Sequence, residues 1–166
     1  MMSTQHLVSI GWSAAANPMT AGQAAARMAL QRLATRQAQC VIVFGSSWFD
    51  QHKLLEGIHS VFPGIPLVGG STAGEITPEG PKSHSCVVLA VGYDDIAASI
   101  GVGTSIERNP RLAGYQAAQQ AIRHFPGRSR SGFLLFGDGL LTGYAEVLRG
   151  IQEVLGTSSL VTGALM

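Results

Sequence analysis

Charged residues are scarce in this chain. Asp, Glu, Lys and Arg make up 13% of its 166 residues and the formal net charge is +1, whereas typical soluble proteins are roughly a quarter charged. Lys and Arg form no run, so the sequence lacks the basic patch that binds nucleic acid or an anionic membrane. We therefore expect no nucleic acid and no membrane as a partner. Because few surface residues can be charged, we expect one face of the protein to be buried against another part or another molecule.

Long hydrophobic runs are also missing. No apolar stretch approaches the roughly 20 residues of a membrane span, and residues 1–6 lack the basic and apolar regions of a signal peptide. The protein is accordingly expected in the cytoplasm. Its two cysteines, Cys40 and Cys86, lie in apolar runs, which favours buried reduced thiols over a disulfide or a thiolate metal ligand.

The motifs of common enzymes are absent. No glycine loop is followed by Gly-Lys-Ser/Thr, and no Gly-x-Ser-x-Gly elbow is present. Gly101-Val-Gly103 lacks the third glycine of a dinucleotide fingerprint. Neither His-Glu-x-x-His nor paired Cys-x-x-Cys motifs, which would indicate zinc, occur. The sequence therefore favours a protein that is not an enzyme.

The chain does contain an internal duplication with a period of about 92 residues. Asn17-Pro18 and the alanines behind it recur from Asn109-Pro110, with seven identities in thirteen positions. Other matches keep the same order, and they include Ser9-Ile-Gly11 with Ser99-Ile-Gly101, Phe44-Gly45 with Phe136-Gly137, and Gly70 with Gly163. A collinear repeat of this kind indicates one structural unit present twice.

The repeated unit alternates strands with helices. Asn17-Pro18 is typical of a helix start, and the alanine-rich stretch to about Gln37 continues that helix. Continuous apolar runs rich in β-branched residues predict buried strands. We expect strands at Leu7–Gly11, Cys40–Phe44, Ile65–Val68, Cys86–Val91, Ile96–Val102, Phe133–Phe136 and Leu160–Val161, and further helices over about 54–62, from Pro110, and over about 147–155.

These elements predict an α/β fold with a mixed, largely parallel sheet, built from two tandem β-α-β-α-β(-β) repeats. Copy one covers about residues 7–95 and copy two, which is incomplete, about 96–166. A hairpin at Asp94-Asp95 adds antiparallel character. Copy two has no counterpart of roughly residues 74–95, which leaves an open sheet edge. We therefore expect the chain to be part of a longer protein or to complete its sheet with a second chain.

The first candidate binding segment is one in which the two copies differ, Gly69 to Glu75. Its glycines, including Gly70 and Gly74, can turn backbone N–H groups outward, and Ser71 and Thr72 add hydroxyls. Glu75 offers a charge for an amine or another cation. The aligned segment Thr162–Leu165 has no hydroxyl at the positions of Ser71 and Thr72. A turn that only caps a strand is the alternative.

The second candidate is the strand-to-helix corner Ser46-Ser47-Trp48, because ligands of α/β sheets bind at the carboxyl ends of strands. The helix start behind it suits an anion, and Trp48 adds an aromatic face. Asp50 as a helix N-cap, with Trp48 as partial core, is the alternative. The five histidines lack metal-ligand spacing, but His52 follows Trp48 at a helix start. His52 is therefore the candidate metal ligand, as an axial ligand of haem.

Several of these segments together resemble one family. Val43-Phe-Gly45, the stretch Pro63 to Glu75 with the sequence PGIPLVGGSTAGE, and Phe136-Gly-Asp-Gly139 are similar to the N-terminal part of the FIST sensory domain. The resemblance covers nearly all of residues 1–166. It implies a bacterial cytoplasmic ligand sensor that is usually followed by a C-terminal FIST part, and residues 1–166 do not include such a part.

One branch of that family, the NosP-like proteins, binds haem, senses nitric oxide and regulates histidine kinases and cyclic-di-GMP signalling. The resemblance to this branch implies haem as a cofactor and a signalling protein such as a histidine kinase as a partner. Three other functions stay open: a sensor of a small amino-acid-like molecule without haem, a structural interaction module, and a hydrolase with Ser71 or Thr72 as nucleophile and Glu75 as base.

Overall fold

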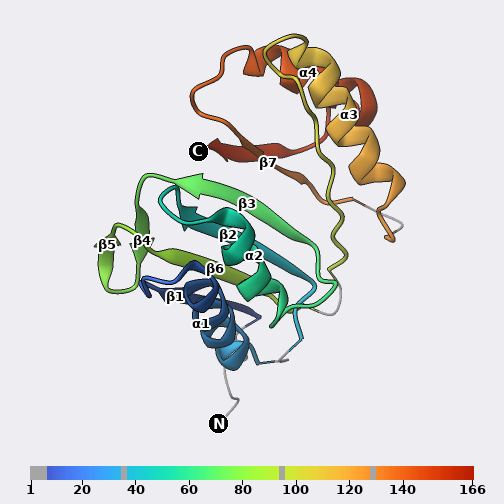
Figure 1. Cartoon of the computed structure of the whole chain (residues 1–166). Helices are drawn as coiled ribbons and strands as arrows, with labels where there is room; N and C mark the ends of the chain where they lie inside the picture. The colour runs from blue at the N-terminus through green and yellow to red at the C-terminus, as the bar shows by residue number, and fades with distance from the viewer. Residues whose placement is uncertain (1–6, 35–36, 94–95, 128–129) are drawn as a thin grey trace. The chain divides into compact units, whose positions relative to one another are not determined.

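The computed structural model describes residues 7–34, 37–93, 96–127 and 130–166 (Figure 1). These residues form two compact units, unit 1 (Met1–Ile96) and unit 2 (Ala97–Met166). Strands and helices alternate in both units, and the sheet of unit 1 contains parallel and antiparallel pairs. The mixed α/β fold predicted from the sequence is confirmed.

Unit 1 consists of two helices, a sheet and a small hairpin. The four longer strands form the sheet, in the order β1-β6-β2-β3, and β4 and β5 form the hairpin. The elements are β1 Val8–Ser13, α1 Pro18–Arg32, β2 Cys40–Ser46, α2 Gln51–His59, β3 Leu67–Thr72, β4 Glu75–Thr77, β5 Gly80–Lys82 and β6 Cys86–Val91.

The last strand of unit 1 is inserted between its first two. β2 and β3 are parallel, whereas β6 is antiparallel to both of its neighbours, β1 and β2. Three of the four strands, β1, β2 and β3, therefore run in one direction and β6 runs in the other. The mixed character was predicted, but the place of β6 in the middle of the sheet was not.

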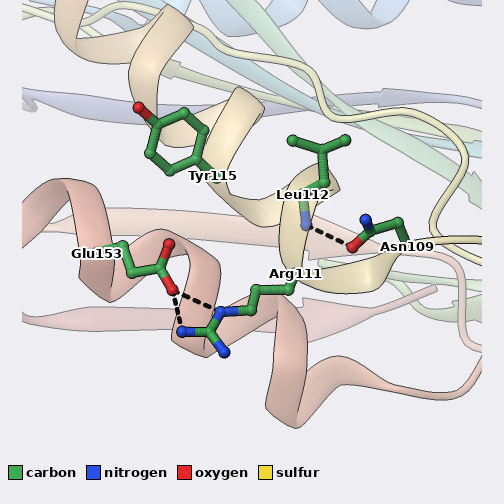
Figure 2. A pocket seen from close by; sticks show the side chains of 5 residues that line it. All are labelled: Asn109, Arg111, Leu112, Tyr115 and Glu153. Carbon is green, nitrogen blue, oxygen red and sulfur yellow. Dashed lines mark hydrogen bonds and ion pairs between the residues drawn. The ribbon is translucent and has the colours of Figure 1, made fainter.

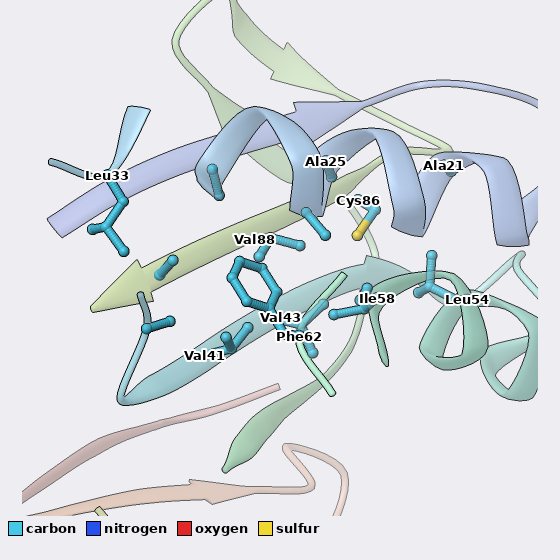
Figure 3. Packing of buried hydrophobic residues seen from close by; sticks show 14 residues of the cluster. Ala21, Ala25, Leu33, Val41, Val43, Leu54, Ile58, Phe62, Cys86 and Val88 are labelled. Carbon is cyan, nitrogen blue, oxygen red and sulfur yellow. The ribbon is translucent and has the colours of Figure 1, made fainter. Parts of the chain in front are cut away.

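Helices α1 and α2 pack against each other on one face of this sheet (Figure 1). Asn17 caps α1 by accepting a hydrogen bond from the backbone N–H of Thr20 at 3.0 Å, and Pro18 is the first helical residue. The buried face of α1 is mostly alanine, so the helix can lie close to the strands. Figure 3 shows the resulting core, which includes Ala21, Ala25, Leu33, Val41, Val43, Leu54, Ile58, Phe62, Cys86 and Val88.

Two helices of unit 1 differ in their bounds from the sequence pattern. α1 ends at Arg32, before Gln37, and α2 both begins and ends about three residues earlier than predicted. Phe62, which the pattern placed on the second helix, is still buried but lies in the turn that follows. Within the described part of the chain, no helix is both long and apolar enough to cross a membrane.

Unit 2 repeats the first elements of this plan. Asn109 caps α3 as Asn17 caps α1, by accepting from the backbone N–H of Leu112 at 3.0 Å. β7 and β8 are parallel neighbours with the same register as β2 and β3: Phe133 lies opposite Val161, as Val41 lies opposite Leu67 in unit 1. The elements are α3 Pro110–Arg123, β7 Phe133–Gly137, α4 Tyr144–Leu155 and β8 Val161–Leu165.

The structure corrects the alignment of the two copies at their last shared strand. A Cβ on Gly69 would lie 1.8 Å from the carbonyl oxygen of Val43, and a Cβ on Gly163 would lie 1.8 Å from that of Leu135. Gly163 is therefore the counterpart of Gly69, and not of Gly70 as sequence matching predicted. One additional residue between α4 and β8 accounts for the shift.

Two predicted strands are also corrected. Residues 96–105 have no regular structure, so Ile96–Val102 is not a strand. An extended segment becomes a strand only when another strand pairs with it, and none does so among the described residues. β3 begins at Leu67 and runs through Thr72, so the segment from Gly70 to Thr72 is strand and not turn. The hairpin predicted at Asp94-Asp95 lies outside the described residues.

Candidate functional site

The ends of β2 and β3 bring the two candidate segments together. The strands are parallel neighbours, and their last residues pair as Gly45 with Ser71 and Ser46 with Thr72. Just beyond, the backbone N–H of Ser47 donates to the carbonyl of Thr72 at 3.0 Å. Residues 46–48 and 70–75 thus form one rim at the carboxyl edge of the sheet, where α/β folds bind ligands.

Glu75, the last residue of the rim, is buried, with only 3% of its surface exposed. Its Oε1 accepts a hydrogen bond from the Thr72 hydroxyl at 2.5 Å. Its Oε2 accepts from the hydroxyl and the backbone N–H of Ser85, at 2.6 and 3.2 Å. Sequence analysis gave Glu75 the role of a charge for a ligand, but here the chain's own donors surround the carboxylate. One side chain therefore ties the end of β3 to the start of β6.

The corner after β2 is built around Ser46, which is fully buried. Its carbonyl accepts from the side-chain amide of Gln51 at 2.9 Å, and its hydroxyl accepts from the backbone N–H of Trp48 at 3.4 Å. Asp50 caps α2 by accepting a backbone hydrogen bond in the first turn at 3.2 Å. Ser46 therefore shapes the corner, whereas Ser47 and Trp48 are exposed.

The two glycines of the predicted site lie in different places. Gly70 is inside β3, half-buried, opposite Phe44 of β2. Gly74 is exposed in the short connection between β3 and β4, and a Cβ there would make an ordinary contact with the Lys82 carbonyl at 3.4 Å. Gly70 therefore belongs to the scaffold, while Gly74 leaves the edge of the rim uncrowded.

The outer surface of the rim has polar groups that the chain does not use. Ser47 and Ser71 are exposed, and neither hydroxyl has a hydrogen-bond partner in the described part of the structure. Trp48 is 79% exposed, and its ring meets the ring of His84 edge-on with 5.0 Å between centroids. His84 has a φ of +54°, a conformation that costs a non-glycine residue about 1 kcal/mol or more and that clusters at functional sites. Sequence analysis did not predict this pair, whose members are far apart along the chain.

His52 is not a member of this aromatic pair. It is exposed at the second position of α2, and the described residues contain no group of three His, Cys, Asp or Glu side chains that could hold a metal ion. A haem ligand depends on a shielded pocket around the iron, whereas His52 and Trp48 both face solvent. The residues present therefore do not fit a haem held by His52.

Cys86 is buried at the start of β6, next to Ser85. Burial, and then the charge of Glu75, raise the pKa of its thiol to about 12. Burial also raises the pKa of Cys40. Both are free thiols, as the sequence predicted. Because the thiolate is the reactive form, neither cysteine supplies a nucleophile at neutral pH.

We expect this buried thiol to weaken the fold in alkali. Above pH 9.0 the Cys86 thiol ionises in the unfolded chain, but in the folded chain it keeps its proton up to about pH 12. The unfolded state then binds fewer protons, so the free energy of unfolding falls as pH rises, by up to about 1.4 kcal/mol per pH unit. Urea unfolding between about pH 8 and pH 11 measures the slope. Cys86→Ala should flatten it more than the control Cys40→Ala, and an equal slope in Cys86→Ala would contradict the assignment.

Unit 2 repeats the backbone of the rim but not its exposed hydroxyls. Asp138, at the position of Ser46, keeps a polar side chain and accepts from the backbone N–H of Leu140 at 2.8 Å. The Gly139 N–H donates to the Met166 carbonyl at 2.7 Å, which is the equivalent of the backbone bond beyond β2 and β3. Leu165 takes the place of Ser71 in the paired strands, and Met166 follows it at the position of Thr72. The hydroxyls of Ser47 and Ser71 therefore have no counterpart in unit 2.

A separate pocket of about 340 Å³ lies in unit 2, between α3 and α4 (Figure 2). Its charged groups, Arg111 and Glu153, form an ion pair with each other, and the Asn109 side chain caps α3. The polar groups of the pocket are thus engaged within the chain, unlike the hydroxyls of the rim. Sequence analysis did not predict this pocket, which is lined by Asn109, Arg111, Leu112, Tyr115 and Glu153.

Comparisons with known proteins identify one family. The FIST N domain model matches residues 39–166, well over half of the chain. The search of curated proteins finds no match. Among solved structures, the chain is similar to an empty FtsZ dimer from M. jannaschii, with 18% identity and a TM-score of 0.35, over 56% of this chain and 27% of that chain. The chain spans about a quarter of the FtsZ chain, and so weak a likeness carries no argument.

Proposed function

The chain belongs to the FIST family, which is a family of sensory domains, and on that premise we propose that it binds a small polar ligand at the rim and does not act as an enzyme. One observation carries the proposal. In unit 1, the register of β2 and β3 sets the unused hydroxyls of Ser47 and Ser71 at one sheet edge, beside the exposed ring of Trp48. The equivalent edge of unit 2 has lost these groups.

The chemistry of the rim suits an amino-acid-like ligand. Hydroxyls both donate and accept hydrogen bonds, so Ser47 and Ser71 match a carboxylate or an amine. The N-terminus of α2 directs partial positive charge toward the same corner, which favours the carboxylate. Trp48 and His84 offer aromatic surface to an apolar side chain.

Glu75 supports binding over catalysis. A hydrolase would need the Thr72 hydroxyl as nucleophile and Glu75 as its base, and these two groups are indeed hydrogen-bonded. The other carboxylate oxygen, however, accepts two hydrogen bonds from Ser85, so Glu75 also ties β3 to the start of β6. A buried carboxylate engaged on both oxygens by the chain's own donors serves the fold and leaves no free oxygen face for a substrate.

The same contacts suggest how binding becomes a signal. Thr72, Glu75 and Ser85 link the rim to β6, one of the two inner strands of the sheet. A ligand that prefers one arrangement of the rim shifts the protein toward it, and the shift reaches β6 through this link. The proposed receiver is a cytoplasmic signalling protein such as a histidine kinase.

Titration of the protein with each standard L-amino acid tests the proposal. A Trp12→Phe variant leaves Trp48 as the only tryptophan, so we expect its fluorescence to change on binding. Ser47→Ala and Ser71→Ala should each weaken binding roughly fivefold or more, because each hydroxyl contributes about 1 kcal/mol. Ser158→Ala, an exposed serine of unit 2, is the matched control. Native mass spectrometry of the purified protein would show a ligand retained from the cell.

Haem is the competing ligand, and its spectrum distinguishes it. We expect ferric haem added to the protein to keep the broad Soret absorption of free haem. A sharpened and shifted Soret band that saturates at one haem per chain, and that is lost in His84→Ala or His52→Ala, would replace the polar ligand with haem. If no amino acid changes Trp48 fluorescence and no small molecule is retained, binding at the rim is contradicted.

A further inference from the structure

The sheet of unit 1 has two faces, and the helices of the unit cover one of them. Side chains alternate between the two faces along each strand. The Ser9 hydroxyl of β1 donates to the Ala29 carbonyl of α1 at 2.6 Å, so Ser9 lies on the helix side. Val8 and Ile10 of the same strand therefore point to the opposite face, where they are 48% and 39% exposed.

The register of the strands arranges the side chains of this second face in rows. In the middle row Ile10 lies opposite Leu89, Leu89 opposite Ile42, and Ile42 opposite Val68. The same register defines one row on each side of it. The ten side chains of the second face, called the open face below, are Val8, Ile10, Trp12, Cys40, Ile42, Phe44, Val68, Val87, Leu89 and Val91.

The open face carries no charge. None of the residues of β1, β2, β3 and β6 is charged. Lys82 of β5 lies at one corner of the face, with its ammonium group 5.5 Å from the centroid of the Trp12 ring. A sheet face that meets water is ordinarily polar where the opposite face is apolar. A contiguous apolar face instead marks an interaction site.

The open face is large enough for a specific contact between two copies of the chain. Four strands at a spacing of ~4.8 Å, with six residues each at a rise of ~3.3 Å, give a face of about 19 Å by 20 Å. Two such faces in contact remove on the order of 1,000 Å² of accessible surface from water, which is the lower bound for a specific interface. The net charge of +1 leaves two copies with little electrostatic repulsion.

We propose that the open face is a dimer interface, at which a second copy of the chain packs its own open face across a two-fold axis. A two-fold contact requires a surface to match only itself, and a uniformly apolar face does so without paired charges. The other sheets among the described residues have two strands each, so a face of equal width belongs to another copy. Ser47 and Ser71 are not part of the open face, so this dimer is independent of ligand binding at the rim.

Sedimentation equilibrium of the chain tests the dimer. We expect a reversible dimer with a dissociation constant in the micromolar range, because the interface is small. Ile10→Lys should raise that constant about tenfold or more, since the ammonium group would lose water within the apolar contact. Val8→Lys should act in the same direction, and urea unfolding shows whether each variant is folded.

Ile76→Lys is the matched control. Ile76 is 87% exposed on β4 and lies outside the open face, so the same change there should leave the dissociation constant unchanged.

Cys40 shows whether the contact lies on the open face. Its thiol belongs to that face and is half-buried in the single chain. In a Cys86→Ala background, the rate of Cys40 alkylation by a maleimide should fall several-fold as the protein concentration rises through the dissociation constant. In Ile10→Lys the rate should not depend on protein concentration.

Three results would overturn the proposal. The first is a chain that remains monomeric at about 100 μM, well above a micromolar dissociation constant. The second is a dimer that Ile10→Lys and Val8→Lys both leave intact, because its contact then lies elsewhere on the protein. The third is a dimer whose formation leaves the alkylation rate of Cys40 unchanged.

Discussion

Gly22→Ala is expected to destabilise unit 1 by about 2 kcal/mol or more, although alanine is the better helix former. A Cβ at Gly22 of α1 would lie 2.3 Å from the carbonyl oxygen of Leu54 in α2. The approach is mutual, because a Cβ at Gly57 of α2 would lie 2.2 Å from the carbonyl oxygen of Met19. Backbone atoms of packed helices cannot rotate away, so the two helices must separate.

Whether Gly22→Ala raises or lowers stability shows which of two contributions is larger, helix propensity or the close packing of α1 and α2. Helix propensity alone predicts a gain of about 1 kcal/mol for glycine to alanine. Separation of α1 from α2 instead loosens contacts of fully buried core residues such as Ala25 and Ile58, which costs more than that gain. We therefore expect the midpoint of urea unfolding to fall.

Two further variants are compared with Gly22→Ala. Ala24→Gly changes an exposed position of the same helix and should cost only the propensity term of about 1 kcal/mol. Gly114→Ala should repeat the effect in unit 2, because a Cβ there would lie 2.1 Å from the Val147 carbonyl oxygen. A rise in the midpoint for Gly22→Ala would show that α1 and α2 do not cross at these glycines.

These glycines show why much of the scaffold could be predicted from the sequence. Positions that need a particular residue for local reasons repeat between the copies: the caps Asn17 and Asn109, and the helix-crossing residues Gly22 and Gly114. A capping side chain acts within one helical turn, and a glycine without a Cβ matters at one close contact. Both requirements depend on a single residue and can be recognised in the sequence. The sequence therefore predicted the starts of α1 and α3 and the repeated unit.

Features that depend on distant partners were not predictable. The sequence of residues 96–102 is that of a strand, but strand formation is decided by a neighbour, and no described strand lies beside it. The place of β6 between β1 and β2 is likewise a matter of tertiary pairing. The predicted site residues of β2 and β3 do meet, because parallel strands share a carboxyl edge. His84 and Ser85 contact these residues in the folded chain, and the sequence alone contained no signal for those contacts.

Glu75→Gln is expected to lower the free energy of unfolding by about 3 kcal/mol. Both oxygens of the buried carboxylate accept hydrogen bonds, one from Thr72 and two from Ser85. The amide of glutamine keeps the shape but replaces one acceptor by a donor, which then faces a hydroxyl or an N–H group. At least one buried donor loses its partner, and β3 is no longer tied to β6.

The exposed Glu79 provides the matched control. Its carboxylate is 62% exposed and forms a surface ion pair with Lys82, so Glu79→Gln should change stability by less than about 1 kcal/mol. Urea unfolding of the two variants gives the comparison.

The pKa of the Cys86 thiol provides a second measurement, which depends on the charge of Glu75 as well as on packing. The charge of Glu75 is the second cause, after burial, of the raised pKa of the Cys86 thiol. In Glu75→Gln this pKa should fall from about 12 while remaining above 9.0, because the thiol is still buried. Thiolate absorbance in a Cys40→Ala background follows it, and Glu79→Gln should leave it unchanged. If Glu75→Gln preserves both the stability and the thiol pKa, the carboxylate is not the link between β3 and β6. Its negative charge would then be free to meet a ligand, as the sequence alone suggested.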